Sequence, residues 1–389
     1  MRITEIRQLA VPLEGNISNA VVSFSGHDVS LVALVTDVMR NGRAVIGYGF
    51  NSIGRFAQGG IIRSRMAPRV LAAAPESLLA ADGKTFDAAR VLAAAMKNEK
   101  PGGHGDRAGA AGAIELAVWD LNAKLMDEPA YAVIARHYGK PGAQAQAVDV
   151  YAAGGYYYPP GASRTLGDEL RAYRDMGFTA FKMKIGGAPL AVDMQRIEEA
   201  LQVAGEGSRL AVDANGRFDL GMATDYARAM APYQLRWFEE IGDPLDYQLN
   251  AQAIAAYDGA VATGENLFSL TDAQNLVRFG GMRPARDIFQ MDPGISYGLT
   301  EYAKMIALLE ANGFARKQAY PHGGHLINLH IVVGMGLGGC EAYPGVFQPF
   351  GGYSPQCAVG GSTVRPSDAP GFGLEQKAEL APLLARLAG

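Results

Sequence analysis

The chain has little cysteine, and neither Cys340 nor Cys357 belongs to a metal-binding spacing. We therefore expect neither a disulfide framework nor a zinc site, and we expect a reducing, cytoplasmic setting. The N-terminal segment, residues 1–7, lacks the apolar core of a signal peptide. The longest apolar stretch, around Ile331 to Leu337, is too short to span a membrane.

Charge is also sparse. Charged residues make up 19% of the 389 residues, the net charge is −4, and no basic run recurs, which argues against nucleic-acid binding. The chain is instead rich in apolar residues, which account for 49% of it. That is enough for a large core and for more than one domain.

Three acidic residues stand at even intervals: Asp213, Glu239 and Glu265 are each 26 residues apart. Each ends a short apolar run bounded by turn residues, as expected of a buried parallel strand. A strand–helix unit of a barrel takes roughly 25–30 residues, so the carboxylates would lie side by side at the C-terminal ends of successive strands. Converging carboxylates repel each other without a cation, and they fit a hard divalent ion, one Mg²⁺ per subunit. The alternative is that each acid only caps the following helix.

One repeat earlier, residues 181–186 place two lysines in an otherwise apolar strand. Because alternate residues share a face of a strand, Lys182 and Lys184 point the same way, toward the barrel mouth. Their mutual repulsion and a nearby metal are expected to lower the pKa of at least one, which would make it a usable base. A solvated basic strand end is the alternative.

Two further strand ends supply an acid and a histidine. Asp292 ends the apolar run 288–292, and His322 follows the next strand 30 residues later. A carboxylate beside a histidine orients the imidazole and raises its pKa, as a general acid or base requires. A lone histidine is usually structural, but the paired acid favours a catalytic role. Glu341 adds an acid at the last strand position.

The first part of the chain lacks this alternation and is typical of an α+β unit. Residues 30–36 and 44–49 are predicted to form strands joined by a turn at Asn41-Gly42. We assign residues 1–130 to this unit and residues 131–365 to the strand–helix alternation.

The tail, about 366–389, is expected to pack back on the first unit. Two glycine-containing loops of that unit, at about 15–27 and 50–60, would close over the strand ends and exclude water. Ordinary turn glycines are the alternative.

These motifs resemble those of the enolase superfamily, and within it the mandelate racemase-like group. The resemblance covers essentially the whole chain and rests on Lys182-x-Lys184, Asp213, Glu239, Glu265, Asp292 and His322. It implies an α/β fold, a modified TIM barrel of the type (β/α)7β with an N-terminal α+β capping domain. Several segments more narrowly resemble the D-tartrate dehydratases: residues 98–105, 151–158, 182–187, 213–218, 263–268 and 321–325.

The resemblance implies a role for each residue. Asp213, Glu239 and Glu265 would hold Mg²⁺, to which the substrate carboxylate binds. Lys184 would remove the proton α to that carboxylate. Lys182 would lower the pKa of Lys184 and contact the developing enediolate.

On the other side of the barrel mouth, His322 would be oriented by Asp292 and would protonate the hydroxyl that leaves the β carbon. Glu341 would hydrogen-bond the developing enediolate oxygen. Asn19 and Lys100 would contact the distal end of the substrate.

Two more residues complete the predicted substrate site. Tyr158 ends an aromatic run, residues 156–158, that would form a wall of the site. Ile53 stands where the tartrate enzymes are expected to carry an asparagine, in the segment Asn51-Ser52-Ile53-Gly54. Losing a polar partner from a site built for it can change discrimination by orders of magnitude.

We therefore expect Mg²⁺-dependent dehydration of a small hydroxy diacid or acid sugar, with D-tartrate to oxaloacetate as the leading case. One alternative is a racemase or epimerase of a 2-hydroxy acid, which would use the same two bases on one carbon. Another is a non-catalytic acid-binding relative. The resemblance also implies a homo-oligomer, either a dimer or an octamer.

Overall fold

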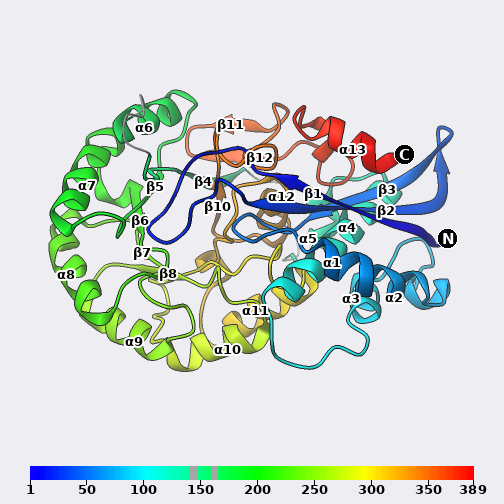
Figure 1. Ribbon diagram of the computed structural model, residues 1–389, viewed down its shortest axis with the longest axis horizontal. Coiled ribbons are helices and arrows are strands. Elements are labelled where there is room, and N and C mark those ends of the chain that lie inside the picture. Colours follow the sequence, from blue (N-terminus) through cyan, green and yellow to red (C-terminus); the bar gives the residue numbers. More distant parts are fainter. Residues whose placement is uncertain (140–146, 159–164) are drawn as a thin grey trace.

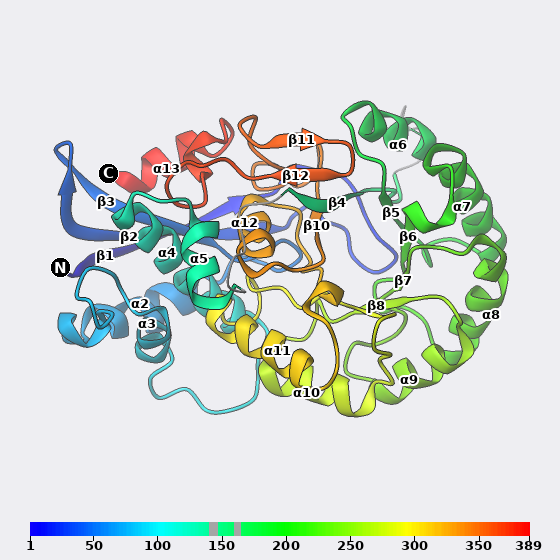
Figure 2. The ribbon, with the colours of Figure 1, turned by 180° about the vertical axis from the view of Figure 1, so that it is seen from behind.

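The computed structural model describes residues 1–139, 147–158 and 165–389. A sheet with its helices lies at one end, and strands surrounded by an arc of helices lie at the other (Figure 1). The view from behind shows the same two parts, with the tail helix α13 (Ala381–Ala388) beside the N-terminal sheet (Figure 2).

The N-terminal part, which we call the cap, is built on an antiparallel sheet. Its strands are β1 (Ile3–Pro12), β2 (Asp28–Arg40) and β3 (Arg43–Phe50), with β2 in the middle. The predicted hairpin is confirmed, and its turn residues Asn41 and Gly42 have φ values of 50° and 74°, as a two-residue turn of this kind requires. The cap helices follow in chain order: α1 (Gly59–Ile61), η1 (Ile62–Met66), α2 (Ala67–Leu71), η2 (Pro75–Leu78), α3 (Ala88–Ala95), α4 (Asp106–Met126) and α5 (Ala130–Tyr138).

Helix α4 is buried along most of its length and is rich in alanine and glycine. The sheet lies directly on it because β3 presents glycine there. A Cβ at Gly49 would lie 2.5 Å from the carbonyl oxygen of Ala113, and one at Gly47 would lie 2.3 Å from that of Ala117. Any side chain at either position would push the sheet off the helix.

The second part is the barrel. Its strands are β4 (Val148–Ala153), β5 (Phe181–Lys184), β6 (Leu210–Asp213), β7 (Phe238–Glu239), β8 (Val261–Thr263), β9 (Ile288–Phe289) and β10 (Gly339–Ala342). Neighbours from β4 to β9 pair in parallel, and β10 pairs in parallel with β4. Between β9 and β10, Ala319 forms a parallel bridge with Phe289 and accepts a hydrogen bond from the Gly338 N–H. The ring is therefore closed, which confirms the predicted fold class.

The barrel helices form the outer layer: α6 (Leu166–Asp175), α7 (Leu190–Ala204), α8 (Leu220–Met230), α9 (Tyr247–Ala256), α10 (Leu270–Phe279), α11 (Leu299–Ala311) and α12 (Leu326–Met335). Short 3₁₀ turns also occur: η3 (Gly207–Arg209), η4 (Ala231–Tyr233), η5 (Arg316–Gln318) and η6 (Leu374–Gln376). A buried cluster that includes Tyr151, Trp237 and Ala262 fills the barrel interior. The barrel is thus a packed core with its polar groups at the strand ends. No helix in the described part of the chain has the length and apolar character needed to cross a membrane.

The tail returns to the cap. After the hairpin β11 (Ala358–Gly360) and β12 (Thr363–Arg365), the Phe372 N–H donates to Asp120 Oδ1 on α4 at 2.7 Å. Arg7 on β1 donates to the Leu387 carbonyl at 2.7 Å. These contacts support the proposal that the tail completes the cap.

The cap and the barrel share a buried joint at Glu115. This residue of α4 accepts hydrogen bonds from the backbone N–H groups of Leu299 and Thr300, at 2.8 and 2.9 Å, at the start of α11. A carboxylate at a helix N-terminus satisfies donors that have no partner within the helix.

Candidate active site

The predicted metal ligands converge at one end of the barrel. Asp213 and Glu239 are the last residues of β6 and β7 and lie in register, and Glu265 follows β8. One carboxylate oxygen from each of the three lies within 4.8 Å of the others. A compact set of carboxylate oxygens, mostly buried, fits a hard divalent ion such as Mg²⁺.

The lysines of β5 insert among these acids. Lys182 Nζ lies 2.5 Å from Glu239 Oε1 and 2.8 Å from Glu341 Oε1. Lys184 Nζ lies 2.5 Å from Asp213 Oδ2. Both lysines therefore point toward the strand ends, as strand alternation predicts.

The pKa of Lys184 is higher than its ordinary value in this ion-paired arrangement, whereas the predicted lowering, which invoked a nearby metal, stays a prediction. Burial lowers this pKa and Lys182 lowers it too, but the nearby carboxylates, Asp213 foremost, outweigh both. The pKa of Lys182 is raised for the same reason, chiefly by Glu239 against the effect of burial. The direct contacts of both lysines with the acids are what the sequence did not indicate.

His322 lies between two partners. Its Nδ1 is 3.0 Å from Asp292 Oδ2, and its Nε2 is 3.1 Å from the Tyr343 hydroxyl. Burial lowers the pKa of His322, but Glu265 and Asp292 more than offset it and raise that pKa to about 9. His322 therefore carries a proton at neutral pH in this arrangement.

Glu341 completes the buried network. Its Oε2 accepts a hydrogen bond from the Gly323 N–H at 2.8 Å, while its Oε1 faces Lys182. Burial raises the pKa of Glu341, but Lys182 and His322 outweigh burial and bring it to about 2. The group is thus ionised and holds both Lys182 and the backbone next to His322.

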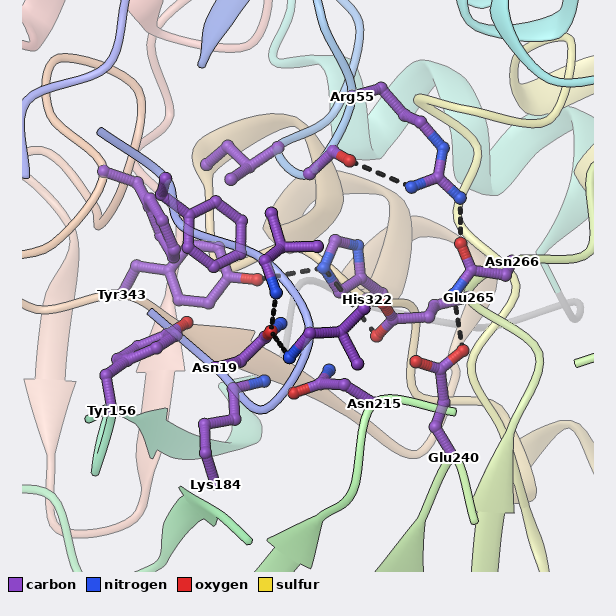
Figure 3. Close-up of a pocket in the computed structure, with 16 residues that line it drawn as sticks. Asn19, Arg55, Tyr156, Lys184, Asn215, Glu240, Glu265, Asn266, His322 and Tyr343 are labelled. Carbon is purple, nitrogen blue, oxygen red and sulfur yellow. Dashed lines mark hydrogen bonds and ion pairs between the residues drawn. The ribbon is translucent and has the colours of Figure 1, made fainter. Parts of the chain in front are cut away.

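Lys184, Glu265 and His322 open into a cavity of about 180 Å³ (Figure 3). Sites for drug-sized ligands usually measure roughly 300–1,000 Å³, so this cavity suits a small molecule. Both predicted loops of the cap contribute to its lining, one between β1 and β2 and the other after β3. The remaining lining residues are Asn19, Val21, Val22, Phe24, Ile53, Gly54, Arg55, Tyr156, Asn215, Glu240, Asn266, Tyr343 and Phe347.

Two predicted substrate contacts, Asn19 and Ile53, line this cavity. The Asn19 side-chain oxygen accepts hydrogen bonds from the backbone N–H groups of Val21 and Val22, at 2.8 and 2.7 Å, so it shapes its own loop. Lys182 lies deeper, fully buried among the acids, and does not line the cavity.

Two other predicted contacts lie elsewhere, and the interpretation is corrected for both. Lys100 lines a separate cavity of about 650 Å³ between α3 and the N-terminal ends of α10 and α11. Its loop is held there because Arg107 donates to the carbonyls of Lys100 and Gly102. Tyr158 does not line the active-site cavity, whereas Tyr156, two residues earlier, does.

Sequence reasoning missed Tyr343 and Arg55, and within the predicted aromatic wall at residues 156–158 it chose Tyr158, whereas Tyr156 lines the cavity. Tyr343 follows Glu341 by two residues, and that spacing on a strand could have placed both on one face. The ring of Tyr156 lies 5.3 Å from Lys184 Nζ. Arg55 follows Ile53 by two residues in a loop, where no periodicity fixes direction.

A comparison with known families matches the barrel part of the chain. Residues 165–380, more than half of the chain, match the family described as "Enolase C-terminal domain-like". The chain belongs to the enolase superfamily. This membership confirms the predicted superfamily, whereas the narrower resemblance to D-tartrate dehydratases stays a prediction.

Several relatives of this superfamily member carry enzyme names. The chain is 32% identical over 233 residues to 3,6-anhydro-alpha-L-galactonate cycloisomerase of Streptomyces coelicolor, covering 59% of each chain. It is 30% identical over 219 residues to L-talarate/galactarate dehydratase of Salmonella typhimurium, covering 56% of this chain and 51% of that protein. The matches thus span little more than half the length of these curated relatives.

Solved structures match over nearly the whole chain. A racemase from Streptomyces coelicolor with bound magnesium has a TM-score of 0.75 at 24% identity, with 99% of both chains covered. L-talarate dehydratase from Polaromonas sp. JS666, complexed with Mg and L-glucarate, has a TM-score of 0.74 at 21% identity, with 98% of this chain and 96% of that chain covered. At these identities the likeness establishes the fold.

Proposed function

We propose that this protein catalyses Mg²⁺-dependent dehydration of a small hydroxy acid. The substrate carries a hydrogen and a hydroxyl on the carbon α to a carboxylate, and a second hydroxyl on the β carbon. One observation carries the proposal: Lys184 and His322 both line one cavity of about 180 Å³ that also contains Glu265 of the carboxylate cluster. A base, an acid and a cation site on one small cavity are the groups that such an elimination needs.

Asp213, Glu239 and Glu265 would hold the ion. When bound, Mg²⁺ supplies fixed positive charge for the substrate carboxylate and for the charge that develops when the α proton leaves. The magnesium named in two of the solved structures above supports this choice of metal.

Lys184 removes the α proton, which requires its neutral amine. In the ion-paired arrangement Asp213 keeps its pKa high. When a divalent cation shares those carboxylates, their hold on Lys184 weakens, and burial and Lys182 then act to lower its pKa. Lys182 stays between Glu239 and Glu341, where its positive charge offsets these two carboxylates beneath the cavity.

His322 donates its proton to the leaving hydroxyl. The C–O bond at the β carbon breaks, water leaves, and the enol that remains becomes a 2-keto acid. Asp292 fixes the imidazole through Nδ1, so that Nε2, which lies 3.1 Å from the Tyr343 hydroxyl, is the proton-donating atom. The hydrogen bond to Asp292, which is not a metal ligand, also raises the pKa of His322 and favours the protonated imidazole for this step.

D-tartrate, which would give oxaloacetate, is the substrate we propose first. The segments that resemble tartrate dehydratases support it, as do the acid-sugar dehydratases among the relatives. Ile53 lines the cavity at the position where tartrate dehydratases are expected to carry an asparagine. This apolar side chain is the feature that distinguishes the cavity from the one expected for D-tartrate.

The test is a proton NMR time course in D₂O with Mg²⁺, first on D-tartrate and then on a library of aldonic and aldaric acids. We expect loss of the starting acid and appearance of a keto acid, abolished by EDTA and restored by Mg²⁺. A product that keeps its hydroxyl but gains deuterium at the α carbon would identify a racemase. Binding with neither exchange nor product across the library would overturn the proposal in favour of a binding protein.

A further inference from the structure

The wall that the cap contributes to the cavity is mostly apolar. The cap side chains that reach the cavity include Val21, Val22, Phe24 and Ile53. Arg55 is the one charged cap residue among the lining residues in the described part of the chain. A cation in an apolar wall is unfavourable unless an anion binds there, because removing a charge from water without an anionic partner costs free energy.

We propose that Arg55 binds the second carboxylate of a dicarboxylic substrate, so that the protein selects hydroxy diacids over hydroxy monoacids. This inference rests on the proposed function and names its substrate class. In this proposal the cap recognises a negative charge at the distal end of the substrate, a contact that the elimination itself does not require.

Arg55 is held in position before any ligand arrives. Its Nη1 donates to the Gly54 carbonyl at 2.9 Å, and its Nη2 donates to the side-chain oxygen of Asn266. Its guanidinium carbon lies 5.0 Å from the centre of the Phe268 ring. These contacts fix the plane of the guanidinium, which lowers the entropy cost of binding a planar carboxylate.

None of these contacts supplies an anion. The partners of Arg55 are a carbonyl, an amide oxygen and an aromatic ring, so its positive charge has no counterion among them. A guanidinium has five N–H donors, and these bonds leave several available. The Asn266 amide is itself oriented, because its Nδ2 donates to Glu240 Oε1 at 2.6 Å.

The position of Arg55 matches the far end of a short substrate. Figure 3 shows Arg55 and Asn266 on the side of the pocket away from Lys184. An acid whose α carbon lies at Lys184 and whose first carboxylate lies at the metal ligands would extend its other end toward the cap.

Arg55 differs from the other described lining residues because it is a cation with no role in proton transfer. Lys184 and His322 are assigned to proton transfer, and Glu265 is assigned to the cation. The side-chain oxygen of Asn19 is an acceptor already bonded within its own loop. Of the cationic side chains that line the cavity in the described ranges, Arg55 is the one left for this role.

The experiment compares a diacid with the monoacid of equal length and configuration, in which a CH₂OH group replaces the distal carboxylate. D-tartrate and the corresponding four-carbon aldonic acid form the first pair. We would measure kcat/KM, and α-proton exchange in D₂O, for the wild type, Arg55→Met and Arg55→Lys. Arg217→Met is the matched control, because Arg217 is exposed and does not line the cavity.

We expect the wild type to prefer the diacid. Arg55→Met should lower kcat/KM for the diacid by roughly 100-fold or more, because the distal carboxylate would lose its charged partner. The monoacid should change by less than about threefold, which also shows that the variant folds. Arg55→Lys should lie between, since an ammonium cannot form the paired bonds of a guanidinium.

Equal losses on both substrates, or no loss on either, would overturn this inference and leave the proposed function standing. A wild-type protein that prefers the monoacid would also overturn the inference about Arg55 without affecting the proposed function. If the wild type exchanges the α proton of no acid in the library, the proposed function fails, and the role of Arg55 fails with it.

Discussion

The two walls of the active-site cavity differ in construction. The barrel wall is a network of buried charges in which almost every group holds another, as Lys182 holds Glu239 and Glu341. The cap wall is apolar, with few polar groups and one cation, Arg55. The barrel wall sits on strand ends whose register fixes the distance between groups, and the cap wall sits on loops. From this division we propose that the barrel wall carries the chemistry and that the cap wall selects the substrate.

The largest effect should follow from removing the base. Lys184→Ala should lower kcat by roughly 10³- to 10⁴-fold, as expected when a general base is lost. The variant should still bind Mg²⁺, because the three carboxylates remain, and calorimetric titration with Mg²⁺ would show this. Retained turnover would show that Lys184 is not the base. The proposal that the barrel wall carries the chemistry would then have to be revised.

Changing the acid should separate the two halves of the reaction. His322→Asn should reduce keto-acid formation by roughly 10²- to 10³-fold, because the leaving hydroxyl is no longer protonated. Exchange of the α proton with D₂O, followed by NMR, should persist because Lys184 is untouched. Loss of both processes would show that His322 also takes part in proton removal.

A smaller effect should follow from a change at Trp237, which lies below the barrel wall and contacts one of the proposed metal ligands. The Trp237 indole N–H donates to Glu239 Oε2 at 2.7 Å, while Lys182 holds Oε1 of the same carboxylate. Trp237→Phe should weaken Mg²⁺ binding by roughly 10- to 100-fold, as losing the partner of a ligand usually does. Calorimetry gives the affinity, and saturating Mg²⁺ should restore most of the activity.

The chain offers a matched control for this change. The Trp119 indole donates to Glu115 Oε1 at 2.9 Å, on α4 and away from the carboxylate cluster. Trp119→Phe removes the same kind of hydrogen bond and should leave Mg²⁺ affinity unchanged. Equal effects from both variants would mean that general destabilisation explains the first.

The smallest effect should come from the cap wall. Ile53→Asn should shift relative kcat/KM among hydroxy acids by about tenfold, in favour of those with more hydroxyl groups. The rate of α-proton exchange on a good substrate should change little, because Ile53 contacts no reacting group. A loss as large as that of Lys184→Ala would contradict the division between the walls.

The barrel and its acids could be predicted from the sequence for a simple reason. A repeated strand–helix unit brings residues one repeat apart to adjacent strand ends, so the spacing of Asp213, Glu239 and Glu265 was enough to place them together. The direction of Lys182 and Lys184 followed from strand alternation.

The other features of the site could not be predicted from the sequence, because they depend on contacts between segments that are distant in the chain. The loop that carries Lys100 turns toward α10 and α11 because Arg107 holds it, and no spacing in the sequence signals that. Arg55 depends on a partner, Asn266, from the other part of the molecule. The contact between the Lys184 ammonium and Asp213, which raises the pKa of Lys184 in this arrangement, also could not be predicted from strand alternation alone.

Glu115 has a consequence for how substrate enters. Two backbone N–H groups in the first turn of the barrel helix α11 donate hydrogen bonds to the buried Glu115 carboxylate of the cap. Swinging the whole cap aside would break these buried hydrogen bonds and expose the apolar surface around them to water, which costs free energy. The cap and the barrel should therefore unfold in one cooperative transition, with the body of the cap fixed during turnover. Only the loops at residues 15–27 and 50–60 would open and close the path to the cavity.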